Sequence, residues 1–245
     1  MKSIETMKLF YKSVYSAFQT SVLVLIMLFS IADSNAQSLS IDFHAIGKNS
    51  ILPNSPISLH INEQDSVKIT EFRFYISKVS FWKSNKQIWV EEESFHLIDL
   101  LDDSTHKINL KIPDEMVSDK LEFYLGIDSL TNVSGAMGGD LDPTRGMYWT
   151  WQNGYINAKI EGMSNVCKSR KNEFQFHLGG YMAPFLCVQK IEMIVDRNEY
   201  IQIGVNVEKM IEAFDLSKQT KIMSPSLNAV EVSKQLAKCF YLMGN

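Results

Sequence analysis

Residues 69–82 decide the fold, and they read ITEFRFYISKVSFW. The run is long and rich in β-branched and aromatic residues, which is the composition of a β-strand. Similar segments lie at short intervals along the chain with turn residues between them, and no strand–helix alternation of the parallel α/β class occurs. Many strands joined by turns are typical of a β-sandwich or barrel. The expected strands are 40–46, 69–82, 87–90, 95–100, 106–112, 121–127, 147–160, 173–178, 188–195 and 200–207.

Two short helices are expected near the end of the chain. Asn206 is placed to cap a helix over 207–214. Ser224 followed by Pro225 has the pattern of a capped helix start, and a partly amphipathic run continues from there to about Met243. The expected fold class is therefore all-β, an antiparallel β-sandwich with one or two short C-terminal helices.

The first 36 residues have the pattern of a secretory leader. Their start is basic, residues 21–31 are apolar, and Ser34 and Ala36 have the small-residue spacing that signal peptidase recognises. This predicts a signal peptide over 1–36, cleaved after Ala36, and a single periplasmic or secreted domain over 37–245. The apolar run is short for a membrane span, and no second long one follows, so the mature chain is not expected to insert in a membrane. The alternative is an N-terminal anchor that stays attached.

Charge and composition exclude two classes of protein. The 245 residues include 24 Lys and Arg against 28 Asp and Glu, which gives a formal charge of −4. Mild acidity offers no basic footprint for nucleic acid. Hydrophobic residues make up 45% of the chain, which argues against intrinsic disorder.

Three histidines on expected strands are candidate metal ligands. His44, His96 and His177 each stand between apolar neighbours, so each imidazole should point away from the face that those neighbours occupy. Exposure to solvent is the common state of such a residue, but neutral imidazole is also the commonest side-chain metal ligand. His60 and His106 have the pattern of surface strand residues. The spacing motifs of zinc proteases, redox dithiols and serine hydrolases are absent, which weakens a hydrolase interpretation.

Two tryptophans follow a long Gly-containing loop over 128–146. A loop of this length in a compact domain is usually functional or disordered. Trp149 and Trp151 are two positions apart on an expected strand, so both should point to one face, roughly 7 Å apart along the chain. They are either an anchor of the core or part of a site.

Three cysteines fall in the mature part of the chain. Cys167 and Cys187 flank the segment 173–180, and an oxidising compartment would allow a disulfide between them. Cys239 is then left unpaired. The alternative is three reduced, buried thiols.

The stretch 124–162 resembles the MbnP-like family. The matching runs are LGIDSLTN at 125–132, LDP at 141–143, GMYWTWQNGY at 146–155 and KIEG at 159–162. Downstream, FHLGG at 176–180 is similar to the family's His-Leu-Gly strand. Upstream, FYIS at 74–77 and FHLID at 95–99 resemble its early strands.

This resemblance implies a periplasmic or surface β-sandwich that binds copper. In such proteins a partner di-haem protein of the cytochrome c peroxidase type converts one Trp to kynurenine, and the kynurenine amine and histidines hold Cu(I). Carried over, His177 is the firmest ligand position, with His96 and His44 as candidate second ligands. Trp149 or Trp151 is the residue that would be oxidised. The expected role is that of a carrier or scavenger and not an enzyme; the alternative is a metal-free extracytoplasmic binding or structural module.

Overall fold

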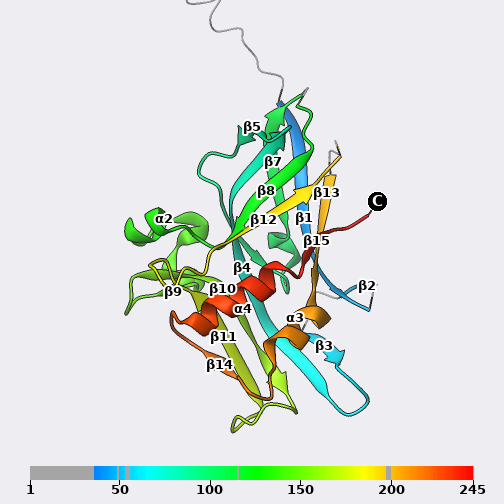
Figure 1. The fold of residues 1–245 in the computed structure, drawn as a ribbon, viewed down its shortest axis with the longest axis vertical. Helices are drawn as coiled ribbons and strands as arrows, with labels where there is room; N and C mark the ends of the chain where they lie inside the picture. The colour runs from blue at the N-terminus through cyan, green and yellow to red at the C-terminus, as the bar shows by residue number, and fades with distance from the viewer. Residues whose placement is uncertain (1–35, 49, 53–55, 115, 197–199, 245) are drawn as a thin grey trace, which may run out of the picture. The chain divides into compact units, whose positions relative to one another are not determined.

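Strand β4 (Ser66–Lys83) is the central strand of the structure, because five other strands in the part of the chain that the structure describes pair with it directly. The computed structural model describes residues 36–48, 50–52, 56–114, 116–196 and 200–244. Within it, residues 38–245 form one unit (Figure 1). Residues 1–35 of the predicted leader lie outside the described residues, and Ala36, after which cleavage is predicted, begins the first described strand. In the described ranges, no helix has the length and apolar character that a membrane crossing requires.

The strands form two sheets of unequal size. The smaller sheet has the order β15-β13-β1-β2, with β7 also paired to β1. Its strands are β1 (Ala36–Gly47), β2 (Ser50–Ile51), β7 (Lys107–Pro113), β13 (Tyr200–Asn206) and β15 (Phe240–Leu242).

The larger sheet has the order β12-β8-β4-β10-β11-β14. Strands β3, β5 and β6 also pair with β4, and β9 pairs with β10. Besides β4, its strands are β3 (Ile57–His60), β5 (Lys86–Val90), β6 (Phe95–Asp99), β8 (Lys120–Leu125), β9 (Tyr148–Trp149), β10 (Gly154–Ser164), β11 (Glu173–Gly179), β12 (Gln189–Ile194) and β14 (Lys221–Ile222).

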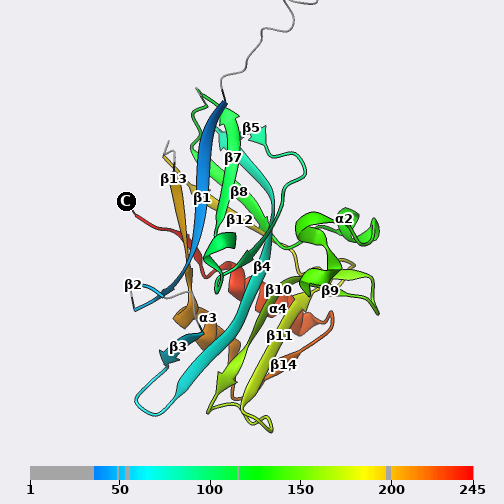
Figure 2. The same ribbon diagram turned by 180° about the vertical axis from the view of Figure 1, so that it is seen from behind.

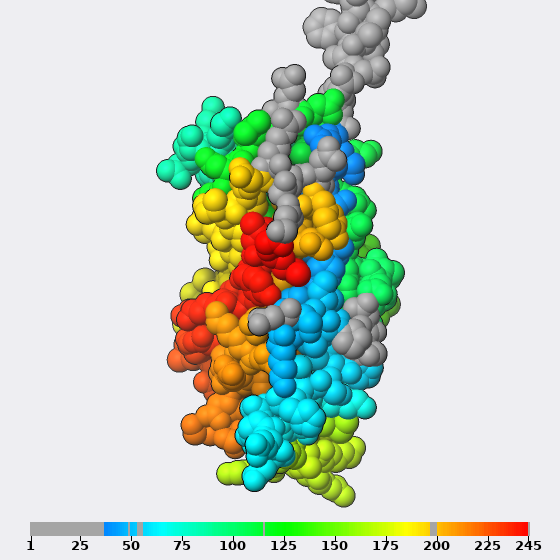
Figure 3. Space-filling view, turned by 90° about the vertical axis from the view of Figure 1, so that its right-hand side faces the viewer, coloured from blue at the N-terminus to red at the C-terminus, as the bar shows by residue number. Residues whose placement is uncertain are grey.

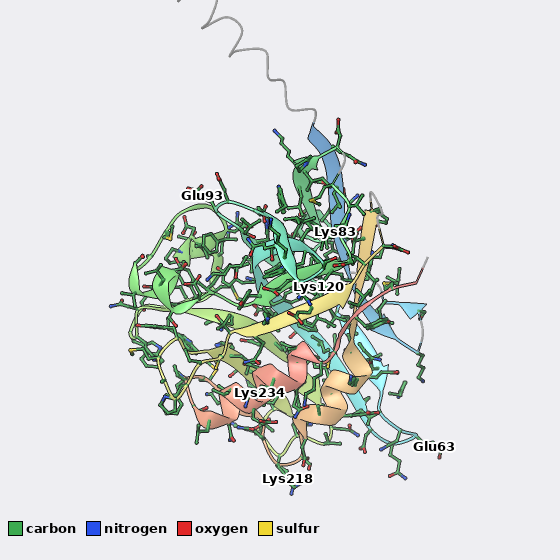
Figure 4. All side chains as sticks on the ribbon, turned by 45° about the horizontal axis from the view of Figure 1, so that its top comes forward. Glu63, Lys83, Glu93, Lys120, Lys218 and Lys234 are labelled. Carbon is green, nitrogen blue, oxygen red and sulfur yellow. The ribbon has the colours of Figure 1, made fainter. Side chains whose placement is uncertain are left out.

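The main core lies between the two sheets. Phe43 of the smaller sheet meets Phe74 and Phe123 of the larger one edge-to-face, with ring centroids 5.9 and 6.0 Å apart. Helices α3 (Val207–Phe214) and α4 (Leu227–Ala237) cover a further part of the inner face of the larger sheet (Figures 1 and 2). Phe214 of α3 packs on Phe176 of β11, and α4 contacts β11 and β12. Among the charged side chains labelled in Figure 4, Glu63, Glu93 and Lys218 project at the edge of the view.

A second apolar cluster occupies the opposite, outer face of the larger sheet. It includes Tyr75, Trp149, Tyr155 and Ile156, and the segment 128–147 covers it. That segment is ordered into helix α2 (Ser129–Val133) and two short 3-10 turns at Gly139–Leu141 and Pro143–Arg145; a third such turn lies at Asp103–Thr105.

The expected all-β sandwich with short C-terminal helices is confirmed, with differences in detail. The pairs β1–β13 and β11–β14 are parallel, so the sheets are mixed and not purely antiparallel. Helix α3 spans the expected residues and is capped by Asn206. Helix α4 is capped by Ser226 and not Ser224, and it ends before a short strand, β15.

Truncation of Phe43 tests the inter-sheet contact. The change Phe43→Ala should lower the free energy of unfolding by about 3–5 kcal/mol, because it leaves a cavity between Phe74 and Phe123. The exposed Ile194→Ala should stay within about 0.5 kcal/mol of wild type. Urea unfolding followed by circular dichroism measures both; equal effects of the two changes would contradict this account of the core.

Candidate metal centre

Three side chains of the types that bind metals converge on the smaller sheet. Among the described residues, Asp42, His44 and His106 are the one group of at least three such residues whose ligand atoms all lie within 4.8 Å of one another. Asp42 and His44 are partly buried, whereas His106 is 5% exposed. The two imidazole rings meet edge-on, with centroids 6.5 Å apart.

The alternation of β1 explains two of these positions. Residues two apart on a strand share a face, so burial of Phe43 against the larger sheet turns Asp42 and His44 outward together. Strand β13 lies parallel beside β1, with Gly204 opposite His44. A side chain at Gly204 would meet the ring of Tyr241, which fills the space there. Figure 3 shows β1 (blue) at the surface beside C-terminal segments (orange and red).

The chain crossing from the larger to the smaller sheet supplies His106. The 3-10 turn at Asp103–Thr105 ends at His106, just before β7. The backbone N–H of Phe43 donates to the carbonyl of His106 at 3.0 Å, which fixes this residue beside β1.

Hydrogen bonds orient two of the three donors. His106 Nε2 lies 2.9 Å from the carbonyl oxygen of Asp99. A carbonyl can only accept, so Nε2 carries a proton. The other ring nitrogen, Nδ1, is the one available to a metal, and it lies 3.6 Å from Asp103 Oδ1. The hydroxyl of Tyr200 donates to Asp42 Oδ2 at 2.7 Å. Burial and this bond raise the pKa of Tyr200, which keeps the hydroxyl a donor. Such outer partners are typical of metal-binding histidines and carboxylates.

The donor set fits a divalent transition metal. Two imidazole nitrogens and one carboxylate oxygen suit Cu(II) or Zn(II). His44 Nε2 lies 3.8 Å from Asp42 Oδ2, close to the separation of two ligands with metal bonds of about 2.0–2.2 Å. Small side-chain rotations would bring three donors to one ion.

The predicted ligand His177 lies elsewhere, on the outer face of the larger sheet. Its Nε2 is 2.7 Å from Glu161 Oε1. Lys159 and Glu71 continue this ionic cluster, with Lys159 Nζ 3.0 Å from Glu71 Oε1. His177 is 7% exposed, and burial lowers its pKa below the ordinary value of 6.5.

The third predicted ligand, His96, faces the other way. It lies opposite Ile76 of β4, whose side chain belongs to the main core, and its Nε2 contacts Glu91 Oε2 at 2.8 Å. His177 and His96 therefore lie on opposite faces of one sheet. The structure brings His44 together with His106, which the sequence pattern placed on the surface, and not with His96 or His177.

The two tryptophans are neighbours, but not as two residues of one strand. β9 ends at Trp149, and residues 150–153 form a turn into β10. Trp149 is 6% exposed and Trp151 is 66% exposed, with ring centroids 5.8 Å apart. The ring of Trp149 lies where a side chain at Gly179 would stand, beside the His177 strand.

Sequence and structure comparisons agree with the resemblance. The family model MbnP matches residues 36–224, which is most of the chain. This chain belongs to the MbnP family. MbnP from Methylosinus trichosporium has a similar fold, with a TM-score of 0.56 and 16% sequence identity over 80% of this chain and 87% of that one. No curated protein sequence matches the chain.

The predicted disulfide of this MbnP family member is not formed in the structure. Cys167, Cys187 and Cys239 are buried free thiols. Cys187 Sγ lies 3.1 Å from the carbonyl oxygen of Gly179, and burial raises the pKa of Cys187 to about 11. The thiols of Cys187 and Cys239 are therefore protonated at neutral pH and pack as small apolar groups.

Two local sequence signals mark turns that the strand pattern does not predict, one before His106 and one after the tryptophans. Asp102 accepts a hydrogen bond from Ser104 N, so an Asp-x-Ser cap marks the turn that carries His106. Asn153-Gly154 is a hairpin dipeptide, and Asn153 has a φ of 50°, which marks the turn after the tryptophans.

Substitution of Gly179 tests the contact with Trp149. In Gly179→Ala, the new methyl would lie 2.7 Å from Trp149 Cζ3 and 2.7 Å from the Tyr155 carbonyl oxygen. Such overpacking should cost about 1–3 kcal/mol of folding free energy and shift the Trp fluorescence. Gly138→Ala, where open space surrounds the site, is the control. A neutral Gly179→Ala with an unchanged spectrum would refute the contact.

Protonation of His177 should destabilise the fold. The folded state holds its pKa below 6.5, so the unfolded chain binds more protons as pH falls below 6.5, and stability decreases. His177→Asn should remove this part of the pH dependence, while the exposed His60→Asn should not. Urea unfolding at pH 7.5 and pH 5.5 measures it; identical pH slopes for wild type and His177→Asn would rule it out.

Proposed function

We propose that this protein is an extracytoplasmic copper-binding protein whose metal is held by His44, His106 and Asp42. The single observation that carries the proposal is the convergence of these three donors, two of them fixed by Asp99 and Tyr200. Membership in the MbnP family supports a copper-related role outside the cytoplasm. Imidazole nitrogen binds both oxidation states of copper.

The site is better suited to holding a metal than to transforming a substrate. His44 and Asp42 remain partly exposed on the outer face of the smaller sheet, so an ion could enter and leave. The hydroxyl bonded to Asp42, that of Tyr200, has a raised pKa and so stays a hydrogen-bond donor and not a nucleophile. We therefore propose a carrier or scavenger and not an enzyme.

A di-haem partner would act on the other side of the protein. Trp151 is the exposed member of the pair and Trp149 the buried one, so a partner that docks there could oxidise either ring. Conversion of one Trp to kynurenine would appear in the intact mass after co-expression with the partner. Substitution of each Trp by Phe in turn would identify the residue.

A metal-free binding module is the second candidate. It is supported by the separation of His44, His96 and His177, and by a cavity of about 630 Å³ next to the tryptophan turn. Tyr148, Tyr181 and Met182 contribute to its walls. This cavity is open to solvent, and its volume lies within the range of ligand sites.

Removal of either imidazole tests the copper proposal. His44→Ala and His106→Ala should each lower copper affinity by at least about 100-fold, because loss of a ligand exceeds the 10–100-fold loss seen for outer partners. His177→Ala, His96→Ala and His60→Ala should bind as wild type does. Copper bound after dialysis, measured by mass spectrometry of the metal, gives the readout.

Two outcomes would contradict this assignment. Full binding by the double variant of His44 and His106 would show that the metal sits elsewhere. Absence of copper in wild type under every expression condition would favour the metal-free module. Circular dichroism of each variant separates loss of the site from loss of the fold.

A further inference from the structure

The donors at His44 and the tryptophan pair lie on opposite sides of the sandwich. His44 points away from the larger sheet, because its neighbour Phe43 points toward it. Trp149 belongs to the cluster on the outer face of the larger sheet, whereas Phe74 belongs to the main core on the inner face. Both sheets stand between the two sites, and packed sheets are about 10 Å apart.

The register of the larger sheet gives a second estimate of the distance between the metal donors and the tryptophan pair. Asp99 pairs with Arg73, Arg73 with Lys159, and Lys159 with His177, in one row across four strands. Asp99 is the residue whose carbonyl holds His106. Three strand spacings, about 14 Å in all, therefore separate the Asp99 end of the row from the His177 end, where Trp149 packs.

A tryptophan-derived group on this pair is therefore out of reach of the metal donors. Among the described residues, the imidazole rings of His44 and His106 make an aromatic ring contact with each other and with no tryptophan. Two tyrosines lie next to the cluster: Tyr200 donates to Asp42, and Tyr241 packs beside Gly204.

We infer that the metal site of this chain is complete without a modified tryptophan, with Asp42 as its third ligand and Tyr200 as the positioning residue for Asp42. This inference rests on the proposed function at His44 and His106. It assigns a ligand class to the site: two imidazoles and a carboxylate form a nitrogen–oxygen set, which suits Cu(II).

Expression without a di-haem partner tests the inference. The full chain is exported in a bacterial host that lacks such a partner, and intact mass establishes that every Trp is unmodified. Addition of Cu(II) sulfate should load one ion per chain, with nitrogen couplings from two imidazoles in the electron paramagnetic resonance spectrum. The double variant of Trp149→Phe and Trp151→Phe should keep this affinity within about twofold, because distant sites act independently.

Variants of Asp42 and Tyr200 test whether the carboxylate is a ligand and whether Tyr200 positions it. Asp42→Asn should lower Cu(II) affinity more than Tyr200→Phe, for which about a 10-fold loss is expected. Tyr200→Phe should also change the g values and copper hyperfine splitting, since Asp42 is then free to turn. Tyr124→Phe on the larger sheet and Asp65→Asn on an exposed turn are the matched controls. Thermal unfolding of the metal-free variants shows whether the fold is retained.

The outcomes separate the inference from the proposed function. If the unmodified chain fails to bind Cu(II), while chain made with the di-haem partner binds copper through His44 and His106, the inference is overturned and the proposed function stands. If Asp42→Asn retains wild-type affinity and an unchanged spectrum, the carboxylate is not a ligand; the inference then fails together with the Asp42 part of the proposed function, while the roles of His44 and His106 are unaffected. If substitution of His44 and His106 leaves copper affinity unchanged in both the unmodified and the partner-treated chain, the proposed function is wrong.

Discussion

The packing of Phe43 against Phe74 and Phe123 is the contact on which the other features depend. It sets which face of β1 is buried, and a shift of one residue would turn every side chain of the strand to the other face. With Phe43 inside, Asp42 and His44 must be outside, and the bond from Phe43 N to the His106 carbonyl brings the third donor to the same place. The candidate metal centre is thus a consequence of the sandwich core.

The run around the tryptophans that resembles the family has a structural role on the outer face of the larger sheet. Trp149 lies on Gly179, and the side chain of Asn132 accepts from Tyr155 N while it donates to two carbonyls of the segment leading into α2. Each contact joins a residue of the family motif to another part of the outer face. The motif therefore identifies the fold, because the covered sheet face requires these residues whether or not a metal is bound nearby.

Local signals in the sequence were sufficient for much of the fold and for part of the site. The composition of β4 and the cap at Asn206 identify their elements directly, because each depends on neighbours in sequence. Parallel pairing of β1 with β13 joins residues about 160 positions apart and leaves no local pattern. The sequence pattern predicts a surface position for His106, but strand alternation does not hold for a residue that ends a 3-10 turn. Its burial comes from contacts with β1 and Asp99, which only the folded chain brings near.

The candidate metal donors and the tryptophan motif lie in different regions of the fold, and this changes what family membership implies for this chain. A resemblance that is strongest around Trp149 and His177 reports on the outer face of the larger sheet, where His177 is neutralised by burial and paired with Glu161. A buried histidine that already has a carboxylate partner gains little by leaving it for a metal. The histidines of the smaller sheet have more distant side-chain partners. His106 Nδ1 lies 3.6 Å from Asp103 Oδ1. His44 Nε2 lies 3.4 Å from Gln202 Nε2 and 3.8 Å from Asp42 Oδ2. This difference in distance favours the smaller sheet for the proposed metal, whereas the tryptophan motif packs on the outer face of the larger sheet.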